Sequence, residues 1–257
     1  MIGGARQPRE DGPPPVPPSH QGCAIRSVRV QLPARRGEPG GEQRAELHDR
    51  HEDGHHLHHL VWRLGPGVRV CSSAVLGGGI GPRAWILNAQ VPGGYPRLDP
   101  DRHLAGIAAS EGLTGPGAGL MTAADVAAYT TGHDGGVTAT VTTGLGVSGW
   151  AAAPDAEAGT PHRPGTVNIV LTLPAALSDA ALINAVATAT EAKVQALLDA
   201  GLDCSGTPTD AVCVAVPEPG PDGGEPFAGP RSTWGARIAR AVHTAVLAGA
   251  RPARDLS

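Results

Sequence analysis

The chain has 257 residues, of which 40% are hydrophobic and 3% aromatic, and its formal charge is −4. This length allows one large domain or two small ones, with a core of Ala, Val, Leu and Ile. Lys193 is the only lysine and the arginines form no basic stripe, which excludes a nucleic-acid partner. Neither a signal peptide nor an apolar run of about 18 residues is present, so we expect a cytoplasmic protein with no membrane partner. The four cysteines are irregularly spaced, which predicts reduced thiols.

Residues 1–58 differ in composition from the rest of the chain. They contain PPPVPP, many charged residues, scattered glycines and little apolar periodicity, which predicts a disordered tail before a single domain at 59–257. The histidine-rich run HEDGHHLHH spans residues 51–59. We interpret it as a solvated tail that binds metals opportunistically, and we expect no fixed metal site. A misassigned start codon, with this stretch not made, is an alternative.

After residue 59, apolar segments alternate with Gly-rich turns and capped helices. Val, Ile and Thr favour strands, and periodic apolar positions favour helices. In chain order we expect strands at 68–75 and 84–91, helices at 101–112 and 123–129, strands at 137–145 and 166–173, a helix at 179–200, a strand at 211–216 and a helix at 233–248. The fold class is therefore α+β, a single domain in which helices pack on a mixed β-sheet.

The helix at 179–200 is the clearest element. Ser178 is a suitable N-cap and Gly201 a suitable C-terminal glycine. Glu191 and Lys193 border an apolar stripe that we expect to face the sheet. That stripe comprises Ile183, Val186, Thr190, Val194 and Leu197.

Two Gly-rich segments are candidates for ligand contact. SSAVLGGGIG at 72–81 follows a strand, but it lacks the spacing of a nucleotide-binding loop, so we favour a turn. PEPGPDGGEP at 217–226 is long enough to be an active-site lid.

Several segments occur in an order that is more specific than any one of them. They are SSAVLGGGIG, NAQVPGGY with DPDRHL, GAGLMTAADV, VTTGL, PGTVNIVL, ATEAKVQALLDAG, GTPTDAV and FAGPRSTWG. This series resembles the adenosylcobinamide amidohydrolase family over roughly residues 60–250.

The resemblance implies hydrolysis of the amide that joins the aminopropanol arm of adenosylcobinamide to the corrin ring. The products would be adenosylcobyric acid and aminopropanol, for cobalamin salvage. The partner is then a corrinoid substrate that carries its own cobalt, so no further cofactor is expected. Short polar side chains suit its peripheral amides, and the substrate-binding candidates are Ser72, Ser73, Asn88, Thr122, Thr143, Thr207 and Thr209.

Amide hydrolysis needs an activated water or nucleophile, oxyanion stabilisation and an acid for the departing amine. We predict Glu191 as the general base and Asp210 as a group that orients a hydroxyl or the leaving amine, with both in one pocket. Structural pairing of the two carboxylates is the alternative. His103 is a further candidate base, and surface or core-edge placement is its alternative.

Two other functions remain open. A corrinoid carrier would keep the binding pocket without hydrolytic groups, and release of aminopropanol would distinguish the enzyme from it. A hydrolase or transferase for a smaller amide would use VTTGL and GTPTDAV as a hydroxyl-lined pocket, and substrate competition would decide that case.

Overall fold

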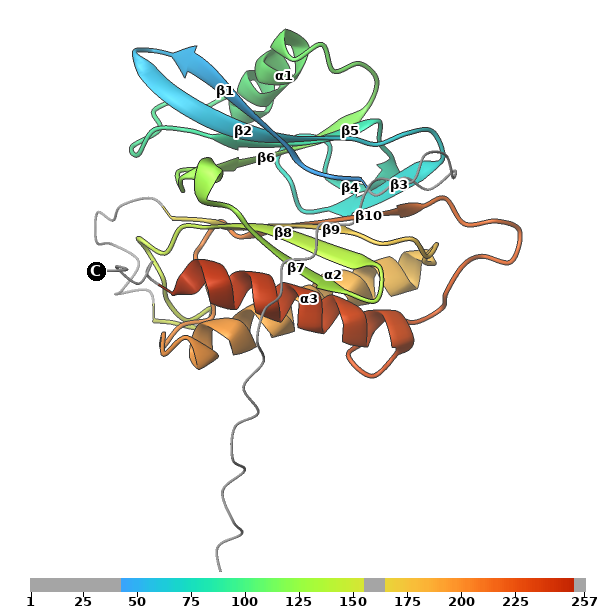
Figure 1. The fold of residues 1–257 in the computed structure, drawn as a ribbon. Helices are drawn as coiled ribbons and strands as arrows, with labels where there is room; N and C mark the ends of the chain where they lie inside the picture. Colours follow the sequence, from blue (N-terminus) through green and yellow to red (C-terminus); the bar gives the residue numbers. More distant parts are fainter. Residues whose placement is uncertain (1–42, 155–164, 252–257) are drawn as a thin grey trace, which may run out of the picture. The chain divides into compact units, whose positions relative to one another are not determined.

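The computed structural model describes residues 43–154 and 165–251. All of these residues belong to one unit, Gly40–Ser257, and the description below concerns that unit alone. The described residues form ten strands, which build two mixed sheets, and three α-helices (Figure 1). None of the described helices has the length and apolar character needed to cross a membrane.

The first sheet has four strands in the order β1-β2-β5-β6. Its strands are β1 (Glu46–Glu52), β2 (His55–Arg63), β5 (Trp85–Gln90) and β6 (Gly117–Thr122). Only β5 and β6 are parallel. Helix α1 (Pro100–Ser110) covers one face, where Leu104 and Ile107 pack against Val61 and Leu87.

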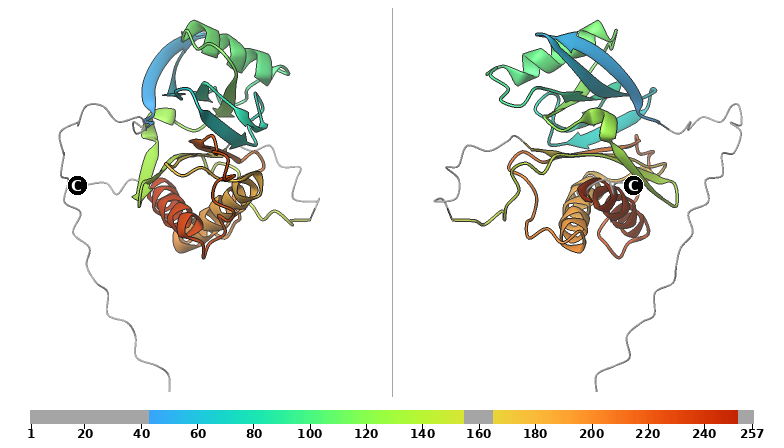
Figure 2. Two further views of the ribbon diagram at one scale, coloured as in Figure 1. Left: turned by 90° about the vertical axis from the view of Figure 1, so that its right-hand side faces the viewer. Right: turned by 60° about the vertical axis from the view of Figure 1, so that its left-hand side comes forward.

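The second sheet has six strands in the order β4-β3-β10-β9-β8-β7. Its strands are β4 (Gly79–Pro82), β3 (Val68–Ser72), β10 (Ala211–Pro217), β9 (Val167–Thr172), β8 (Val137–Thr143) and β7 (Thr130–Asp134). Only β9 and β10 are parallel. Helices α2 (Asp179–Asp199) and α3 (Thr233–Ala250) lie side by side on one face (Figure 2).

The two sheets pack face to face through an apolar core. Leu60, Ile86 and Leu120 of the first sheet contact a cluster that includes Val170 and Cys213 of the second. The layers are therefore α1, first sheet, second sheet, and α2 with α3 (Figure 1). This order leaves the inner faces of both sheets free of helices, so any polar side chain there must find its partners between the sheets.

The α+β class and the mixed sheet packed by helices are confirmed, with two sheets in place of one. All five expected strands are present, as are the helices expected at 101–112, 179–200 and 233–248. At 123–129 the structure has only a short 3₁₀ turn, Val126–Ala128. Strands β1, β2, β4, β6 and β7 were not expected, because their Gly, His and Thr residues obscure the apolar alternation on which strand prediction depends.

The expected boundary at residue 59 is wrong. Strands β1 and β2 form a hairpin that pairs Glu46 with Val61 and Glu52 with His55. At its tip Asp53 and Gly54 have φ of 48° and 78°, as a two-residue Asp-Gly hairpin turn requires. The Asp-Gly pair in the sequence indicates a hairpin turn. The surrounding histidines, however, obscure the alternation of apolar and polar residues that indicates strands. The expected disorder of residues 1–42 lies outside the described residues.

The stripe expected to face the sheet on α2 is only partly right, because Leu197 is buried in the core whereas Thr190 is exposed. Ile183 is 61% exposed, whereas the buried face is rich in alanine and includes Lys193. Small side chains on that face allow α2 to approach α3 and the sheet closely. The expected N-cap is confirmed, since Ser178 Oγ accepts a hydrogen bond from Ala181 N at 3.2 Å. Gly201 at the other end has φ of 84°.

The two Gly-rich segments have structural roles. Gly77 has φ of 64°, and a Cβ there would lie 1.9 Å from the carbonyl oxygen of Gly117, so the close backbone approach requires glycine. The turn interpretation is thereby confirmed. The loop at 217–226 follows the C-terminal end of β10, at the opposite end of that strand from Asp210. The proposed lid is therefore not beside the predicted site.

Candidate functional site

The C-terminal ends of the parallel strands β5 and β6 are the centre of the candidate site. Gln90 and Thr122 are register partners there, and Val91 N donates to Thr122 O at 2.8 Å. Ligands of α/β sheets commonly bind at the carboxyl ends of parallel strands. Two groups of polar side chains lie near this end, one between the sheets and one on the α1 side.

The first group is a hydrogen-bonded network between the two sheets. Asn168 Nδ2 donates to Asn88 Oδ1 at 2.8 Å and to Met121 O at 3.1 Å. Asn88 Nδ2 donates to Thr142 Oγ1 at 3.0 Å. Asn88, Asn168 and Thr142 are each 1% exposed. Asn88 therefore links β5 to β8 and β9, and both ends of its amide are already hydrogen-bonded, which corrects the view of Asn88 as a free substrate binder.

Asp210 anchors the loop that leads into β10. Its carboxylate accepts from Val167 N at 2.8 Å, from Thr207 Oγ1 at 2.6 Å and from Thr207 N at 3.1 Å, and it pairs with the ammonium of Lys193. Gly206 has φ of 141°, and a Cβ there would lie 2.2 Å from Asp210 Oδ2. A carboxylate with this many partners is a structural clamp, since its lone pairs are occupied.

The structure places Ser72, Ser73, Thr143, Thr207 and Thr209 at one end of the second sheet, whereas Asn88 and Thr122 lie on β5 and β6 of the first. Because β3 runs antiparallel to β10, Ser72 lies opposite Cys213 and Ser73 Oγ accepts from Val212 N at 3.1 Å. Ser73 and Thr209 are exposed, and Thr207 is half-buried. The hydroxyls of Thr209 and Thr166 are 2.6 Å apart. These side chains form a hydroxyl-lined edge, which we define as Ser73, Thr207 and Thr209.

The remaining binding candidates are buried or half-buried, and Thr143 lies against α3, since a Cβ on Gly249 would come within 2.5 Å of its Oγ1. Ser72 and Thr122 are buried, and their hydroxyls each accept a hydrogen bond at 3.0 Å, from Ala74 N and Ala124 N respectively. Thr143 is half-buried, and its buried Oγ1 has no hydrogen-bond partner among the described residues. Ser72 and Thr122 therefore shape the turns that follow β3 and β6, and do not present free hydroxyls to a ligand.

The expected convergence of Glu191 and Asp210 is wrong. Glu191 is exposed on α2, whereas Asp210 binds Lys193, two positions further along the same helix. Residues two apart on a helix point about 200° apart, so the two carboxylates serve different faces of α2. The alternative of structural pairing describes Asp210 better, and Glu191 lies exposed on the solvent side of α2.

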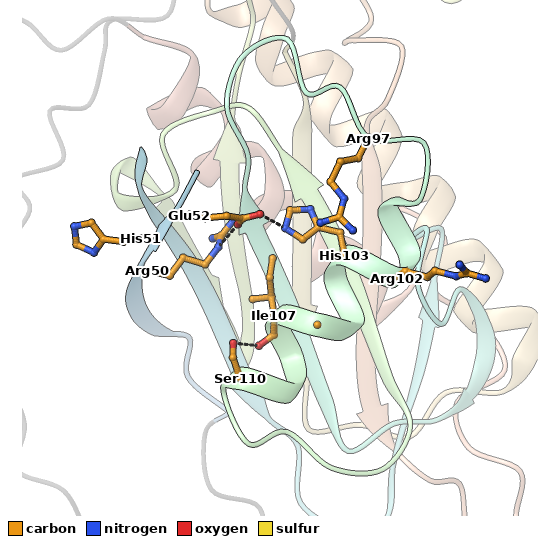
Figure 3. A pocket seen from close by; sticks show the side chains of 9 residues that line it. Arg50, His51, Glu52, Arg97, Arg102, His103, Ile107 and Ser110 are labelled. Carbon is orange, nitrogen blue, oxygen red and sulfur yellow. Dashed lines mark hydrogen bonds and ion pairs between the residues drawn. The ribbon is translucent and has the colours of Figure 1, made fainter. Parts of the chain in front are cut away.

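The second polar group lies on the α1 side, around a cavity of about 460 Å³ (Figure 3). His103 is 6% exposed, and its Nε2 lies 2.5 Å from Glu52 Oε1. Its Nδ1 lies 2.8 Å from the hydroxyl of Tyr95. Arg50 Nε donates to Glu52 Oε2 at 3.0 Å, and its Nη2 donates to the carbonyl of Gln90 at 2.5 Å. Arg50 thereby connects this cavity to the C-terminal end of β5.

An imidazole held between a carboxylate and a hydroxyl can accept and return protons. Glu52 Oε1 approaches Nε2 at ion-pair distance without hydrogen-bond geometry, and Nδ1 faces the hydroxyl of Tyr95. Glu52 was missed because it falls within the supposed tail. None of the residues predicted to bind substrate lines this cavity, whose lining includes Arg50, His51, Glu52, Arg97, Arg102 and His103.

The sequence was also compared with known proteins. Residues 43–257 match the sequence model of a family described as adenosylcobinamide amidohydrolase. The chain belongs to this family. The match begins just before β1, so the hairpin and Glu52 are part of the family domain.

Two relatives carry the same description. The adenosylcobinamide amidohydrolase of Methanosarcina mazei is 33% identical over 184 residues, which cover 69% of this chain and 88% of the relative. That of Halobacterium salinarum is 46% identical over 85 residues, which cover 33% of this chain and 36% of the relative. The family assignment from the ordered motifs is thus confirmed.

Proposed function

We propose that this protein hydrolyses the amide bond that links the aminopropanol arm of adenosylcobinamide to the corrin ring. The products are adenosylcobyric acid and aminopropanol, and the reaction serves cobalamin salvage in the cytoplasm. The observation that carries this proposal is the family match over residues 43–257. It is supported by the polar side chains that distant segments bring to the C-terminal ends of β5 and β6.

The hydroxyl-lined edge suits the periphery of a corrinoid, which displays several amides. Ser73 and Thr209 are exposed, and their hydroxyls can donate and accept hydrogen bonds, whereas the hydroxyl of Thr207 already donates to Asp210 and can only accept. The network behind them, from Asn168 through Asn88 to Thr142, holds the two sheets in register at this end. Cobalt belongs to the substrate, so the reaction as we write it requires no further cofactor.

His103 is the base in the proposed reaction. Water adds to the amide carbonyl carbon while Nδ1 of His103, the nitrogen that faces Tyr95, accepts its proton, and Glu52 Oε1 lies 2.5 Å from Nε2. The imidazolium then returns the proton to the amide nitrogen as the carbon–nitrogen bond breaks. A carboxylic acid on the corrin and free aminopropanol result, and His103 is again neutral.

Incubation of the purified full chain with adenosylcobinamide tests the proposal directly. We expect stoichiometric release of aminopropanol, measured by chromatography, together with a new carboxylate on the corrinoid detected by mass spectrometry. Corrinoid binding without release would identify a carrier. Faster turnover of a small amide, with adenosylcobinamide failing to compete, would instead indicate the smaller-amide enzyme.

A further inference from the structure

His48, His59 and Glu111 form a compact cluster on the α1 face of the first sheet. His48 and His59 are direct cross-strand partners on β1 and β2, so their side chains leave the same face of the hairpin. Glu111 is the residue that ends α1. Its carboxylate oxygens lie 3.0 Å from His48 Nδ1 and 3.0 Å from His59 Nε2. Three elements that are distant in the sequence thus meet at one point.

His59 is unusual among the buried polar side chains. It is 0% exposed, and neither of its ring nitrogens has a partner of hydrogen-bond geometry among the described residues. Its Nε2 is close to Glu111, yet the carboxylate oxygen lies off the direction in which an N–H would donate. Buried polar groups are nearly always hydrogen-bonded or bound to an ion. Both ring nitrogens of His59 are therefore available to bind an ion.

We propose that His48, His59 and Glu111 bind one divalent transition-metal ion of the zinc type. One ligand atom from each residue lies within 4.8 Å of the others. Ligand atoms of a tetrahedral zinc site are about 3.3 Å apart, so small side-chain rotations bring all three into range. Two imidazoles and one carboxylate form a set of ligands that binds zinc in preference to magnesium or calcium.

The surroundings of His48 and Glu111 suit two ligands of a zinc ion. Glu46 Oε2 lies 3.4 Å from Nε2 of His48, which leaves Nδ1 for the metal and gives the second nitrogen a carboxylate partner. The side chains of His48 and Glu111 are 31% and 19% exposed, so an ion and a water as fourth ligand have access from solvent.

The metal would tie the β1–β2 hairpin to the C-terminal end of α1. Eight residues separate His103 from Glu111, which corresponds to about 12 Å along the helix axis. We therefore assign the ion a stabilising role, separate from the proposed hydrolysis at His103. Motifs of closely spaced Cys and His residues do not describe this cluster, because 52 positions of sequence separate Glu111 from His59.

The test is zinc binding by the full chain and by single variants, with no activity readout. Glu111→Gln and His48→Gln remove one donor each and are partly exposed, so both are expected to fold; circular dichroism checks this. His56→Ala is the matched control, since His56 belongs to a separate exposed cluster with Asp49 and His51. After dialysis against buffered zinc, bound metal is measured by mass spectrometry and thermal stability by calorimetry.

We expect one tightly held zinc per chain in the unmodified protein and in His56→Ala, and a melting temperature that falls on chelation in both. In Glu111→Gln and His48→Gln the affinity should fall at least tenfold, and chelation should no longer shift the melting temperature. Absorption bands of Co²⁺ in the same site should indicate four-coordination and disappear in both variants. Unchanged zinc affinity in Glu111→Gln and His48→Gln, or no zinc in the unmodified protein, would overturn the proposal.

Discussion

Lys193 and Asp210 form an ion pair between α2 and the loop before β10, with side chains that are 7% and 12% exposed. The same carboxylate accepts hydrogen bonds from Val167 N and from Thr207. The only lysine of the chain thus holds together a helix, a loop and the start of two parallel strands. The hydroxyl-lined edge depends on this clamp, because Thr207 and Thr209 belong to the loop.

The Asp210→Asn variant should unfold more easily. Removing one partner of a largely buried pair leaves the other charge uncompensated, which costs about 3 kcal/mol. Urea unfolding followed by circular dichroism measures the change. Glu191→Gln on the exposed face of the same helix is the control and should change stability by less than about 0.5 kcal/mol. Equal stability of the two variants would show that the clamp contributes little.

His103→Gln should reduce turnover of adenosylcobinamide by about 100-fold or more, because general acid–base catalysis contributes that much. Glu52→Gln should reduce turnover less, since it leaves the imidazole in place. The Michaelis constant should change little in either variant. His133→Gln replaces an exposed histidine bound to Thr138 and should retain full turnover. Retained turnover in a folded His103→Gln protein would remove His103 from the mechanism.

Two truncations should differ sharply. Removal of residues 1–42 should leave soluble protein with an unchanged melting temperature, because the family match begins at residue 43. Removal of residues 1–58 deletes β1 and part of β2, including the buried Leu57, and leaves the rest of β2 as an unpaired sheet edge. We expect aggregation, visible in size-exclusion chromatography. A soluble, cooperatively folded product of the second truncation would show that the hairpin is dispensable.

Cys213 should be inert to thiol reagents in the native protein. Complete burial raises the pKa of its thiol to about 12, so at pH 8 only about one thiol in 10⁴ is ionised, and only the thiolate reacts. Peptide mass spectrometry after labelling, with and without urea, measures this for each cysteine. Labelling of native Cys213 as fast as in urea would show that the inter-sheet core opens readily.

Local sequence patterns were sufficient for many of the elements. Strands such as β9 and β10 are short, mostly apolar runs rich in Val, and α2 carries its own cap at Ser178. The ordered motifs were likewise sufficient for the family, since they depend on the linear order of residues. These features are encoded within neighbouring residues, where backbone preference and side-chain period act directly.

Only the tertiary structure decided which distant residues meet. Glu52 came to lie beside His103, and Glu111 beside His59, through strand register and the direction of α1. Glu191 and Lys193 differ by two positions, yet the rotation of α2 buried the lysine with Asp210 and exposed the glutamate. Such outcomes depend on how whole elements pack, because a one-residue shift in register or a small helix rotation exchanges the buried and exposed faces.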